Sequence, residues 1–404
     1  MNILSVNKYY WRKGGSEAVF FDEMDLLRRK GHQVIPFSMK NKYNIDTQYE
    51  KYFIEEIDYS RTDIGSRLSN AAKVLYSFDA RSKMKQLLAG HRFDVAHFHI
   101  FQHQISPSVF GPLAQHGVPL ILTLHDLKPI CPNYKMYVDG GVCEACKDRR
   151  FYHSTLRRCN KNSLMNSAIN TLEMYLHYAL GYYQGVNRFI AVSRFHQQKM
   201  IDFGFPEKQL TYIPNMMELD PSNLSGQDEE YALYFGRLSE EKDVVSLIKA
   251  IRHIPCLNLI IAGTGPDELY LKELVVSLEI NNVDFVGFQS GNELHRLIEN
   301  ASFTVLPSKC YENCPMSILE SFAHGKPVVG ANIGGIPELI TDGLDGYCFT
   351  PENEYELAEK LKLMVSIGKT GRREMGINGY EKVKQNHSPE QHYEELMNVY
   401  QSLN

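Results

Sequence analysis

The 404-residue sequence lacks the long hydrophobic runs and the one-sided charge that mark several classes of protein. No segment approaches the ~18 consecutive apolar residues that a membrane-spanning helix needs. Near the start, Lys8, Arg12 and Lys13 interrupt the sequence before the apolar core of a signal peptide can form. With 43 Lys and Arg against 48 Asp and Glu, the formal charge of -5 suits nucleic acid poorly. We expect a cytoplasmic protein without a nucleic-acid partner, which can still touch a membrane surface.

The sequence also lacks short-period repeats and low-complexity tracts, and 43% of its residues are hydrophobic. That share supplies enough apolar side chain for sizeable cores, which excludes a disordered chain. At about 150 residues per domain, the length allows two or three domains. The eight cysteines are expected to be reduced thiols, because no export signal accompanies them.

Short apolar runs alternate with segments of helical spacing throughout the sequence. Continuous apolar runs separated by helices are typical of a parallel sheet covered on both faces. The runs lie at 2–6, 32–37, 93–99, 119–125 and 188–193 in the first half and at 231–236, 258–263, 283–288, 303–307 and 327–331 in the second. The pattern predicts an α/β protein with two doubly wound, Rossmann-like domains in succession.

Two local features divide the chain. The polar stretch 216–230 shows no apolar periodicity and predicts an interdomain linker. Near the end, Ser388-Pro389-Glu390-Gln391 has the pattern of a capping box and predicts a final helix over 389–402. We therefore place an N-terminal domain at 1–218, a C-terminal domain at 219–386, and at 387–404 a helix that returns to the N-terminal domain.

Polar and glycine-rich loops follow several of the apolar runs. Ligands of open α/β sheets bind outside the carboxyl ends of the strands, so these loops are candidate sites. Arg237 and Lys242 follow the run 231–236 and lead into a helix, where such a pair can neutralise a diphosphate. The alternative is a solvated pair balanced by Glu240 and Glu241.

The stretch 308–329 carries two carboxylates around a predicted helix start. Pro315 suits the first helical position, and the helix is expected to end near Gly325. Glu312 precedes this helix and Glu320 lies within it. The backbone amides of the first turn are expected to form an anion site, around Cys314, Met316 and Ser317.

The seven-residue gap between Glu312 and Glu320 (E-x7-E), with GRLSEEK, AGTGP, VGF and NIGGIPELI, resembles the retaining glycosyltransferases of the GT4 family. These enzymes have the GT-B architecture, in which two Rossmann-like domains face each other across a cleft. The segments GGSE (14–17) and TLHD (123–126) resemble the acceptor-binding half. Residues 231–350 resemble the half that binds the nucleotide-sugar donor, so the resemblance spans nearly the whole chain.

The resemblance implies a role for particular residues. Arg237 and Lys242 would hold the nucleotide diphosphate, Glu320 the ribose hydroxyls, and Glu312 would lie beside the donor sugar. His125 would contact a sugar hydroxyl or orient the acceptor, against the alternative of a structural histidine at a strand end. Gly15, Gly265, Gly287, Phe288, Asn313, Cys314, Met316 and Ser317 are the further donor contacts implied. Asn313 stands where the family often has glycine. For that reason we do not infer the identity of the donor sugar from close relatives.

The implied reaction moves a sugar from a nucleoside diphosphate, UDP being favoured, to a saccharide or a polyprenyl-diphosphate-linked saccharide during surface polysaccharide or glycolipid biosynthesis. Retention of the anomeric configuration follows from the family. The sequence contains no Asp-x-Asp pair to hold a divalent metal, so we expect catalysis without a metal cofactor. The alternatives are a sugar-nucleotide epimerase of the same architecture and a non-catalytic sugar-nucleotide-binding module.

Four of the cysteines cluster after TLHD. Cys131, Cys143, Cys146 and Cys159 have the spacing C-x11-C-x2-C-x12-C, which is within reach of a closed, structural zinc site. Reduced thiols without metal are the alternative.

The same loop, 127–161, is strongly basic and is followed by an aromatic-rich amphipathic segment at 164–183. The two together predict docking on an anionic membrane surface. The alternative for the segment is a core helix whose apolar stripe packs on the sheet. The basic residues are Lys147, Arg149, Arg150, Arg157, Arg158 and Lys161.

Overall fold

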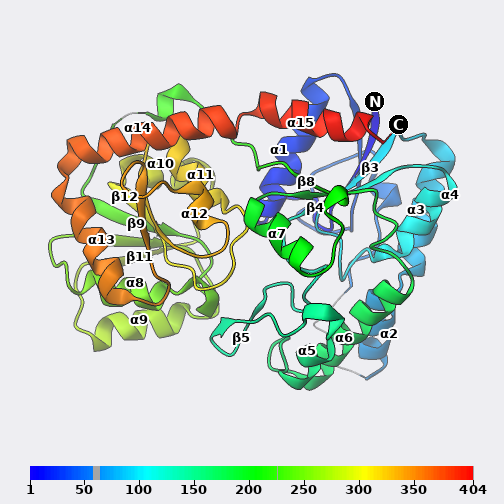
Figure 1. The fold of residues 1–404 in the computed structure, drawn as a ribbon, viewed down its shortest axis with the longest axis horizontal. Coiled ribbons are helices and arrows are strands. Elements are labelled where there is room, and N and C mark those ends of the chain that lie inside the picture. The colour runs from blue at the N-terminus through cyan, green and yellow to red at the C-terminus, as the bar shows by residue number, and fades with distance from the viewer. Residues whose placement is uncertain (58–63, 225, 404) are drawn as a thin grey trace. The chain divides into compact units, whose positions relative to one another are not determined.

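The computed structural model describes residues 1–57, 64–224 and 226–403, and their contacts form two compact units (Figure 1). Ser225, in the predicted linker, lies outside the described residues. The first unit comprises Met1–Met136, Glu144–Ile213 and His392–Asn404. The second comprises Tyr137–Cys143 and Pro214–Gln391.

The first unit contains a six-stranded parallel sheet in the order β2-β1-β3-β4-β7-β8. The central strands are buried along almost their whole length, as their continuous apolar runs predict. The strands are β1 (Asn2–Val6), β2 (Gln33–Phe37), β3 (Val95–Phe98), β4 (Leu120–Leu124), β7 (Arg188–Ala191) and β8 (Leu210–Tyr212). A separate short hairpin pairs β5 (Tyr137–Val138) with β6 (Gly141–Val142).

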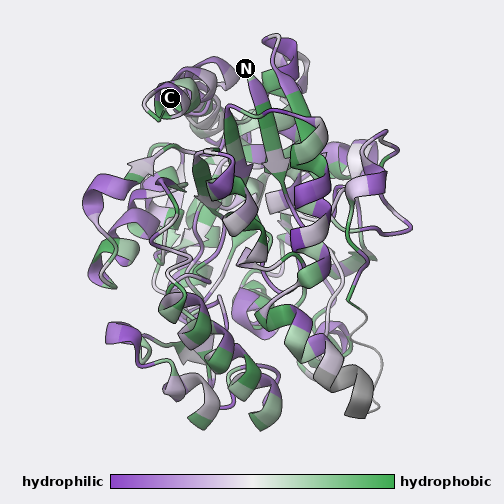
Figure 2. Cartoon of the chain, turned by 90° about the vertical axis from the view of Figure 1, so that its right-hand side faces the viewer, coloured by the Kyte–Doolittle hydropathy of each residue, from purple (hydrophilic) through white to green (hydrophobic). Residues whose placement is uncertain are grey.

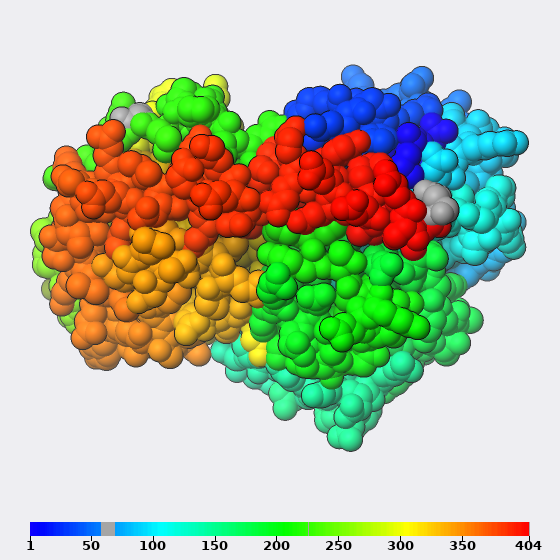
Figure 3. Space-filling model, turned by 45° about the horizontal axis from the view of Figure 1, so that its top comes forward, coloured from blue at the N-terminus to red at the C-terminus, as the bar shows by residue number. Residues whose placement is uncertain are grey.

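The helices of the first unit include the last helix of the chain. Ser388 Oγ accepts a hydrogen bond from the Gln391 amide at 3.3 Å, which confirms the predicted start of that helix. From His392 onward it belongs to the first unit, where Leu396 and Tyr400 share a core with Phe20. In Figure 3 this red segment lies against the blue N-terminal segment. The helices are α1 (Gly15–Arg29), α2 (Ile64–Leu75), α3 (Phe78–Gly90), α4 (Phe110–Gln115), α5 (Tyr152–Leu156), α6 (Leu164–Ala179), α7 (Arg194–Asp202) and α15 (Pro389–Gln401).

The second unit repeats the architecture with a six-stranded parallel sheet in the order β11-β10-β9-β12-β13-β14. Its strands are β9 (Tyr231–Phe235), β10 (Asn258–Ala262), β11 (Val283–Gly287), β12 (Phe303–Leu306), β13 (Val328–Ala331) and β14 (Gly346–Phe349). Its helices are α8 (Val244–Ile251), α9 (Glu268–Ser277), α10 (Gly291–Asn300), α11 (Met316–Ala323), α12 (Ile336–Leu339), α13 (Glu354–Ser366) and α14 (Gly368–Asn386). The two sheets confirm a pair of doubly wound, Rossmann-like domains.

The strand order reverses around β1 in the first sheet and around β9 in the second. Ligands of doubly wound sheets bind at such switch points, beyond the carboxyl ends of the strands. The loop that follows β1 ends at Gly14, directly before Gly15 at the start of α1, and the loop that follows β9 carries Arg237 and Lys242. The topology therefore places two of the predicted loops where this fold binds ligands. No helix in the described part of the chain is both long enough and apolar enough to cross a bilayer.

Candidate functional site

The loops that follow β9 and β10 are joined by backbone hydrogen bonds. The amide of Leu238 donates to the Thr264 carbonyl at 3.0 Å, and the amide of Asp267 donates to the Leu238 carbonyl at 3.1 Å. A Cβ atom on Gly265 would lie 2.0 Å from the Leu238 carbonyl oxygen, so glycine is required there. This close approach explains Gly265 by chain packing, and its predicted donor contact stays a prediction.

Lys242 and Glu312 meet between the loops that follow β9 and β12. Lys242 Nζ forms an ion pair with Glu312 Oε1, which also accepts a hydrogen bond from Ser308 Oγ at 2.6 Å. Burial disfavours the charged ammonium, but the Glu312 carboxylate outweighs it and raises the pKa of Lys242. Lys242 is therefore a fixed cation, and the structure brings two predicted site residues together from segments 70 positions apart.

Two consecutive glycines, Gly334 and Gly335, pack against the backbone of Glu312. The amide of Gly335 donates to the Glu312 carbonyl at 2.7 Å. Gly334 has a positive φ of +62°, and a Cβ atom there would lie 2.4 Å from the same carbonyl oxygen. The sequence analysis identified these glycines only as part of the motif NIGGIPELI. The structure shows that they contact the Glu312 backbone.

Helix α11 begins at Met316, a few residues after Glu312, and carries Glu320. Its first helical residue is Met316, so the prediction that the helix begins at Pro315 was wrong by one position. With ψ at 117°, the Pro315 backbone is extended, and this residue occupies the N-cap position. The Pro315 side chain offers no hydrogen bond to the first turn, whose Met316 and Ser317 are half-buried. Amides without a side-chain cap at a helix N-terminus favour an anion.

The residues flanking this helix start differ in accessibility. Asn313 and Glu320 are half-buried, whereas Cys314 is buried and its carbonyl accepts a hydrogen bond from Asn215 Nδ2 at 3.3 Å. Burial raises the pKa of the Cys314 thiol to about 12, so the thiol stays protonated near neutral pH. Cys314 can therefore offer its backbone to a ligand, but it is not a thiolate nucleophile.

Two further predicted donor contacts lie at the same edge of the second sheet. Arg237 is exposed directly after β9, and Phe288, directly after β11, is 68% exposed. Between them the Gly263 amide donates to the Gly287 carbonyl at 2.7 Å. Both exposed side chains are accessible to a ligand, and their roles stay predictions.

A pocket of about 350 Å³ lies beside α8, on the same loops but away from Glu312. Its charged side chains are mainly carboxylates, which would repel a diphosphate. These are Glu240, Asp243, Asp267, Glu352 and Glu354, against Lys249 and Lys309. The anion site is therefore better placed at Lys242 and the start of α11.

In the first unit, His125 follows β4 and contacts a second histidine. Its Nε2 atom lies 2.9 Å from His99 Nδ1, and the two rings are stacked with centroids 5.2 Å apart. Burial, helped by His99, holds the pKa of His125 well below its ordinary value, so the ring is neutral. The other predicted residue of this unit, Gly15, is exposed as the first residue of α1.

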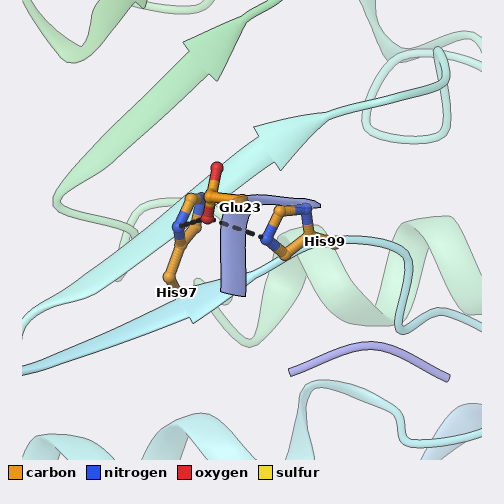
Figure 4. A group of neighbouring side chains, drawn as sticks. All are labelled: Glu23, His97 and His99. Carbon is orange, nitrogen blue, oxygen red and sulfur yellow. Dashed lines mark ion pairs between the residues drawn. The ribbon is translucent and has the colours of Figure 1, made fainter. Parts of the chain in front are cut away.

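Behind His99 lies a buried carboxylate that the sequence reasoning missed (Figure 4). Glu23 Oε1, from α1, lies 2.9 Å from His97 Nδ1 and 3.3 Å from His99 Nε2. Burial alone would raise the pKa of Glu23, but His97 and His99 outweigh it and hold the pKa well below its ordinary value. The ligand atoms of this trio lie within 4.8 Å of one another. The available signal was the pattern His-x-His at 97–99, with both histidines on one buried strand.

The four clustered cysteines are divided between the units. Cys143 belongs by its contacts to the second unit, and Cys131, Cys146 and Cys159 belong to the first. Burial raises the pKa of the Cys131 thiol to about 11, and Cys159 adds to the increase, so these two lie near each other. Cys146 packs with Phe151 and Met174.

Helix α6 buries mainly polar side chains, together with Met174, and exposes several large apolar ones. Glu173 is fully buried and forms an ion pair with the buried Lys128 at 2.6 Å. The alternative of a core helix whose apolar stripe packs on the sheet is therefore wrong, because the buried Lys128–Glu173 pair places the polar side of the helix inward. Hydrophobic colour marks helices along the lower edge of Figure 2, where Figure 1 places α5 and α6. The buried polar side chains are Ser167, Asn170, Thr171, Glu173 and His177, and the exposed apolar ones are Leu164, Met165, Leu172 and Tyr175.

Comparison with known proteins gives relatives that match part of the chain. The chain is 34% identical over 178 residues to the uncharacterized glycosyltransferase MJ1607 of Methanocaldococcus jannaschii, covering 43% of this chain and 45% of that protein. It is 29% identical over 193 residues to the amylovoran biosynthesis glycosyltransferase AmsK of Erwinia amylovora, covering 44% and 47%. The matched segments thus span a little less than half of these two relatives.

Solved structures match over the whole length. Anabaena HepE, solved in complex with UDP, has a TM-score of 0.67 at 18% identity and covers 100% of each chain. Sucrose-phosphate synthase of Thermosynechococcus elongatus has a TM-score of 0.72 at 17% identity and covers 100% of this chain and 98% of that one. At these identities the likeness shows the fold, which is GT-B.

Two family models cover the chain in succession. The model described as Glycosyl transferases group 1 matches residues 216–382. The model described as Glycosyltransferase Family 4 matches residues 13–220, which is more than half of the 404 residues. The chain therefore belongs to glycosyltransferase family 4.

Proposed function

We propose that the protein is a retaining glycosyltransferase that moves a sugar from a nucleoside-diphosphate sugar, with UDP favoured, to a saccharide or lipid-linked saccharide. The observation that carries this proposal is the Lys242–Glu312 pair beside the start of α11, at the carboxyl edge of the second sheet. The UDP complex of HepE supports the donor class. AmsK, a glycosyltransferase of amylovoran biosynthesis, supports a role in surface polysaccharide or glycolipid assembly.

The chemistry needed is stabilisation of a departing diphosphate. The bond from the anomeric carbon to the phosphate oxygen breaks, and that oxygen takes the electron pair. The Lys242 ammonium, the Arg237 guanidinium and the amides at the start of α11 offset its negative charge without a metal cofactor. The acceptor hydroxyl attacks the same face and transfers its proton to a phosphate oxygen of the leaving group. Glu312, paired with Lys242, serves as a ligand of a donor hydroxyl rather than as a covalent nucleophile.

Product analysis with a panel of radiolabelled sugar nucleotides, with and without a saccharide acceptor, tests the reaction. A labelled glycoside that forms only with acceptor supports transfer. An isomerised sugar nucleotide in its absence would establish an epimerase instead. Tight binding of a sugar nucleotide without turnover, across an acceptor panel that includes polyprenyl-diphosphate saccharides, would establish a binding module.

The exposed apolar face of α6 and the basic loop before it form one candidate membrane-binding surface, at 147–161 and 164–180. We propose that this surface docks on anionic lipid, which would bring the enzyme to a lipid-linked acceptor. Leu164 and Leu172 are each 55% exposed, and Arg157 and Arg158 are exposed in the loop before α6. Apolar side chains would enter the headgroup region while the basic side chains contact lipid phosphates.

Replacing Arg157 and Arg158 together by alanine should weaken binding to vesicles rich in phosphatidylglycerol by roughly 30-fold. Each basic residue near an anionic surface contributes about 1 kcal/mol, and about 1.4 kcal/mol is a tenfold change. Vesicle co-sedimentation measures the change, and Lys249→Ala with Lys272→Ala, in the second unit, is the charge-matched control. Equal binding of the wild type to neutral phosphatidylcholine vesicles would contradict an anionic-lipid surface.

We also propose that the four clustered cysteines hold a structural zinc ion. The buried Cys131 with its neighbour Cys159, and Cys146 in an apolar cluster, are a donor set suited to zinc, since thiolates bind it in closed tetrahedral sites. Such a site would stiffen the basic loop rather than take part in transfer.

Elemental analysis should find about one equivalent of zinc per chain in protein purified without chelator. Cys146→Ser should remove the metal and lower the melting temperature, whereas Cys256→Ser, at an exposed cysteine outside the cluster, should change neither. Wild-type protein with less than roughly a tenth of an equivalent would reject the proposal.

A further inference from the structure

Three buried side chains of the first unit point toward one another (Figure 4). Glu23 comes from α1, His97 from β3, and His99 follows that strand directly. Glu23 Oε1 lies 2.9 Å from His97 Nδ1 and 3.3 Å from His99 Nε2, and these atoms all lie within 4.8 Å of one another. Ligand atoms at about 2.0–2.2 Å from one metal ion lie roughly 3 to 3.5 Å apart. The three side chains are therefore spaced as ligands of a single ion.

The direction of one ring nitrogen distinguishes a metal site from a hydrogen bond. Within the part of the chain that the structure describes, the buried His99 Nε2 atom has no hydrogen-bond partner. It lies close to Glu23 Oε1, so the direction of the nitrogen, and not its distance, prevents a hydrogen bond. Ligands of a common ion have this relation, because each lone pair is aimed at the ion and not at the neighbouring ligand. A shared ion thus explains a buried polar atom that has no partner.

Each of the three side chains also has an outer partner on its other polar atom. These partners are the Thr123 hydroxyl, 2.7 Å from His97 Nε2, His125 Nε2, 2.9 Å from His99 Nδ1, and His392 Nε2, 3.3 Å from Glu23 Oε2. Histidines that bind a metal through one ring nitrogen almost always form a hydrogen bond through the other, and carboxylate ligands are held in the same way. The trio therefore has the outer contacts that orient metal ligands.

We propose that Glu23, His97 and His99 bind one divalent transition metal ion through Oε1, Nδ1 and Nε2. The Tyr400 hydroxyl, 2.7 Å from His97 Nδ1, is placed to supply a further oxygen. Two imidazoles and one carboxylate are the donor set typical of non-haem iron(II), whereas thiolates such as those of the cysteine cluster select softer metals. We therefore expect iron(II) at this site, separate from the zinc proposed for the cysteines.

The ion would have a structural role. Glu23, His97 and His99 are at most 3% exposed, so the site presents no open position to a substrate. The ion would join α1 to the end of β3 within the core of the first unit. This inference rests on the first unit alone and does not depend on the proposed sugar transfer.

Elemental analysis of Cys146→Ser protein tests the site, because this variant removes the cysteine cluster from the metal count. Cells are grown with added iron(II), and the protein is purified under nitrogen without chelator. We expect about one equivalent of divalent transition metal per chain, with iron(II) predominant. X-ray absorption at the edge of that metal should show nitrogen and oxygen neighbours at about 2.0–2.2 Å and no sulfur at about 2.3 Å.

Substitution of a ligand separates this site from metal bound elsewhere. Glu23→Gln and His99→Leu, each combined with Cys146→Ser, should retain less than about a tenth of an equivalent. Glu173→Gln is the matched control, because Glu173 is also a fully buried carboxylate of the first unit beside a histidine. It should keep the metal, although the loss of its ion pair with Lys128 destabilises the protein.

Three results would overturn the proposal. The first is less than about a tenth of an equivalent of transition metal in folded Cys146→Ser protein. The second is a wild-type absorption spectrum in which sulfur surrounds all of the bound metal, a measurement that needs no variant to fold. The third is about one equivalent that survives both Glu23→Gln and His99→Leu, which would place the ion elsewhere on the chain. Loss of the metal with sugar transfer unchanged would support the site and its structural role.

Discussion

Lys242→Met should lower kcat by roughly 100- to 1000-fold, the loss typical of removing one preorganised group that stabilises charge in a transition state. The methionine side chain fills similar space but leaves the departing diphosphate without its fixed cation. It also leaves Glu312 as an unpaired carboxylate beside an anionic donor. Initial rates with the sugar nucleotide identified by the donor panel measure the effect.

A second substitution separates these two causes. Lys242→Met combined with Glu312→Gln removes the unpaired carboxylate, so binding of the donor should recover while turnover stays low. Lys249→Met, on α8 of the same unit, removes an exposed ammonium paired with Glu354 and should leave turnover near wild type. Wild-type turnover in Lys242→Met would refute the assignment of the diphosphate to this site.

Lys128→Met should lower the free energy of unfolding by about 3 to 5 kcal/mol, the cost of leaving a buried charge without its partner. Lys128 and Glu173 have side-chain exposures of 1% and 0%, so water cannot replace the missing ammonium. The Lys128 ammonium also donates to the Pro132 carbonyl of its own loop at 3.1 Å, and its ion pair with Glu173 ties α6 to this loop, which follows His125. Urea unfolding monitored by circular dichroism provides the measurement.

Removal of both charges should be better tolerated than removal of one. Lys128→Met with Glu173→Leu replaces the pair by apolar groups of similar volume and should recover most of the lost stability. Lys272→Met breaks an exposed pair with Glu268 and should cost at most about 1 kcal/mol. A loss of the same small size in Lys128→Met would show that water reaches Glu173 and that the pair is not what holds α6.

The fold was largely predictable because its strands are buried on both faces. Every apolar run that we identified contains a strand, and the two helix starts that we predicted, at Pro315 and Pro389, lie within one residue of the observed ones. Of the strands in the two large sheets, β8 and β14 were missed, and both lie at the outer edges of their sheets; the short hairpin of β5 and β6 was missed as well. Each of the two edge strands carries half-buried side chains instead of a continuous apolar run, so local hydrophobicity does not mark them.

The site was predictable where a residue acts through its own chemistry. Lys242 and Glu312 were identified from charge, loop position and motif, and the structure pairs them. Glu23 was not, because a glutamate on an amphipathic helix has no local feature that distinguishes a buried position from a solvated one. Helix α6 was misjudged for a related reason: its inward face is fixed by Lys128, a partner 45 residues away along the chain.

The order of synthesis gives the returning C-terminal helix a further consequence. The first unit begins at Met1, yet its core includes Leu396 and Tyr400, and the Glu23 carboxylate meets His392. A nascent chain can therefore assemble the whole second sheet while Phe20 and its neighbours in the first core still lack Leu396 and Tyr400. Final closure of the first unit must wait until translation has passed Tyr400, so this unit is completed after the second sheet although its first strands are synthesised earlier.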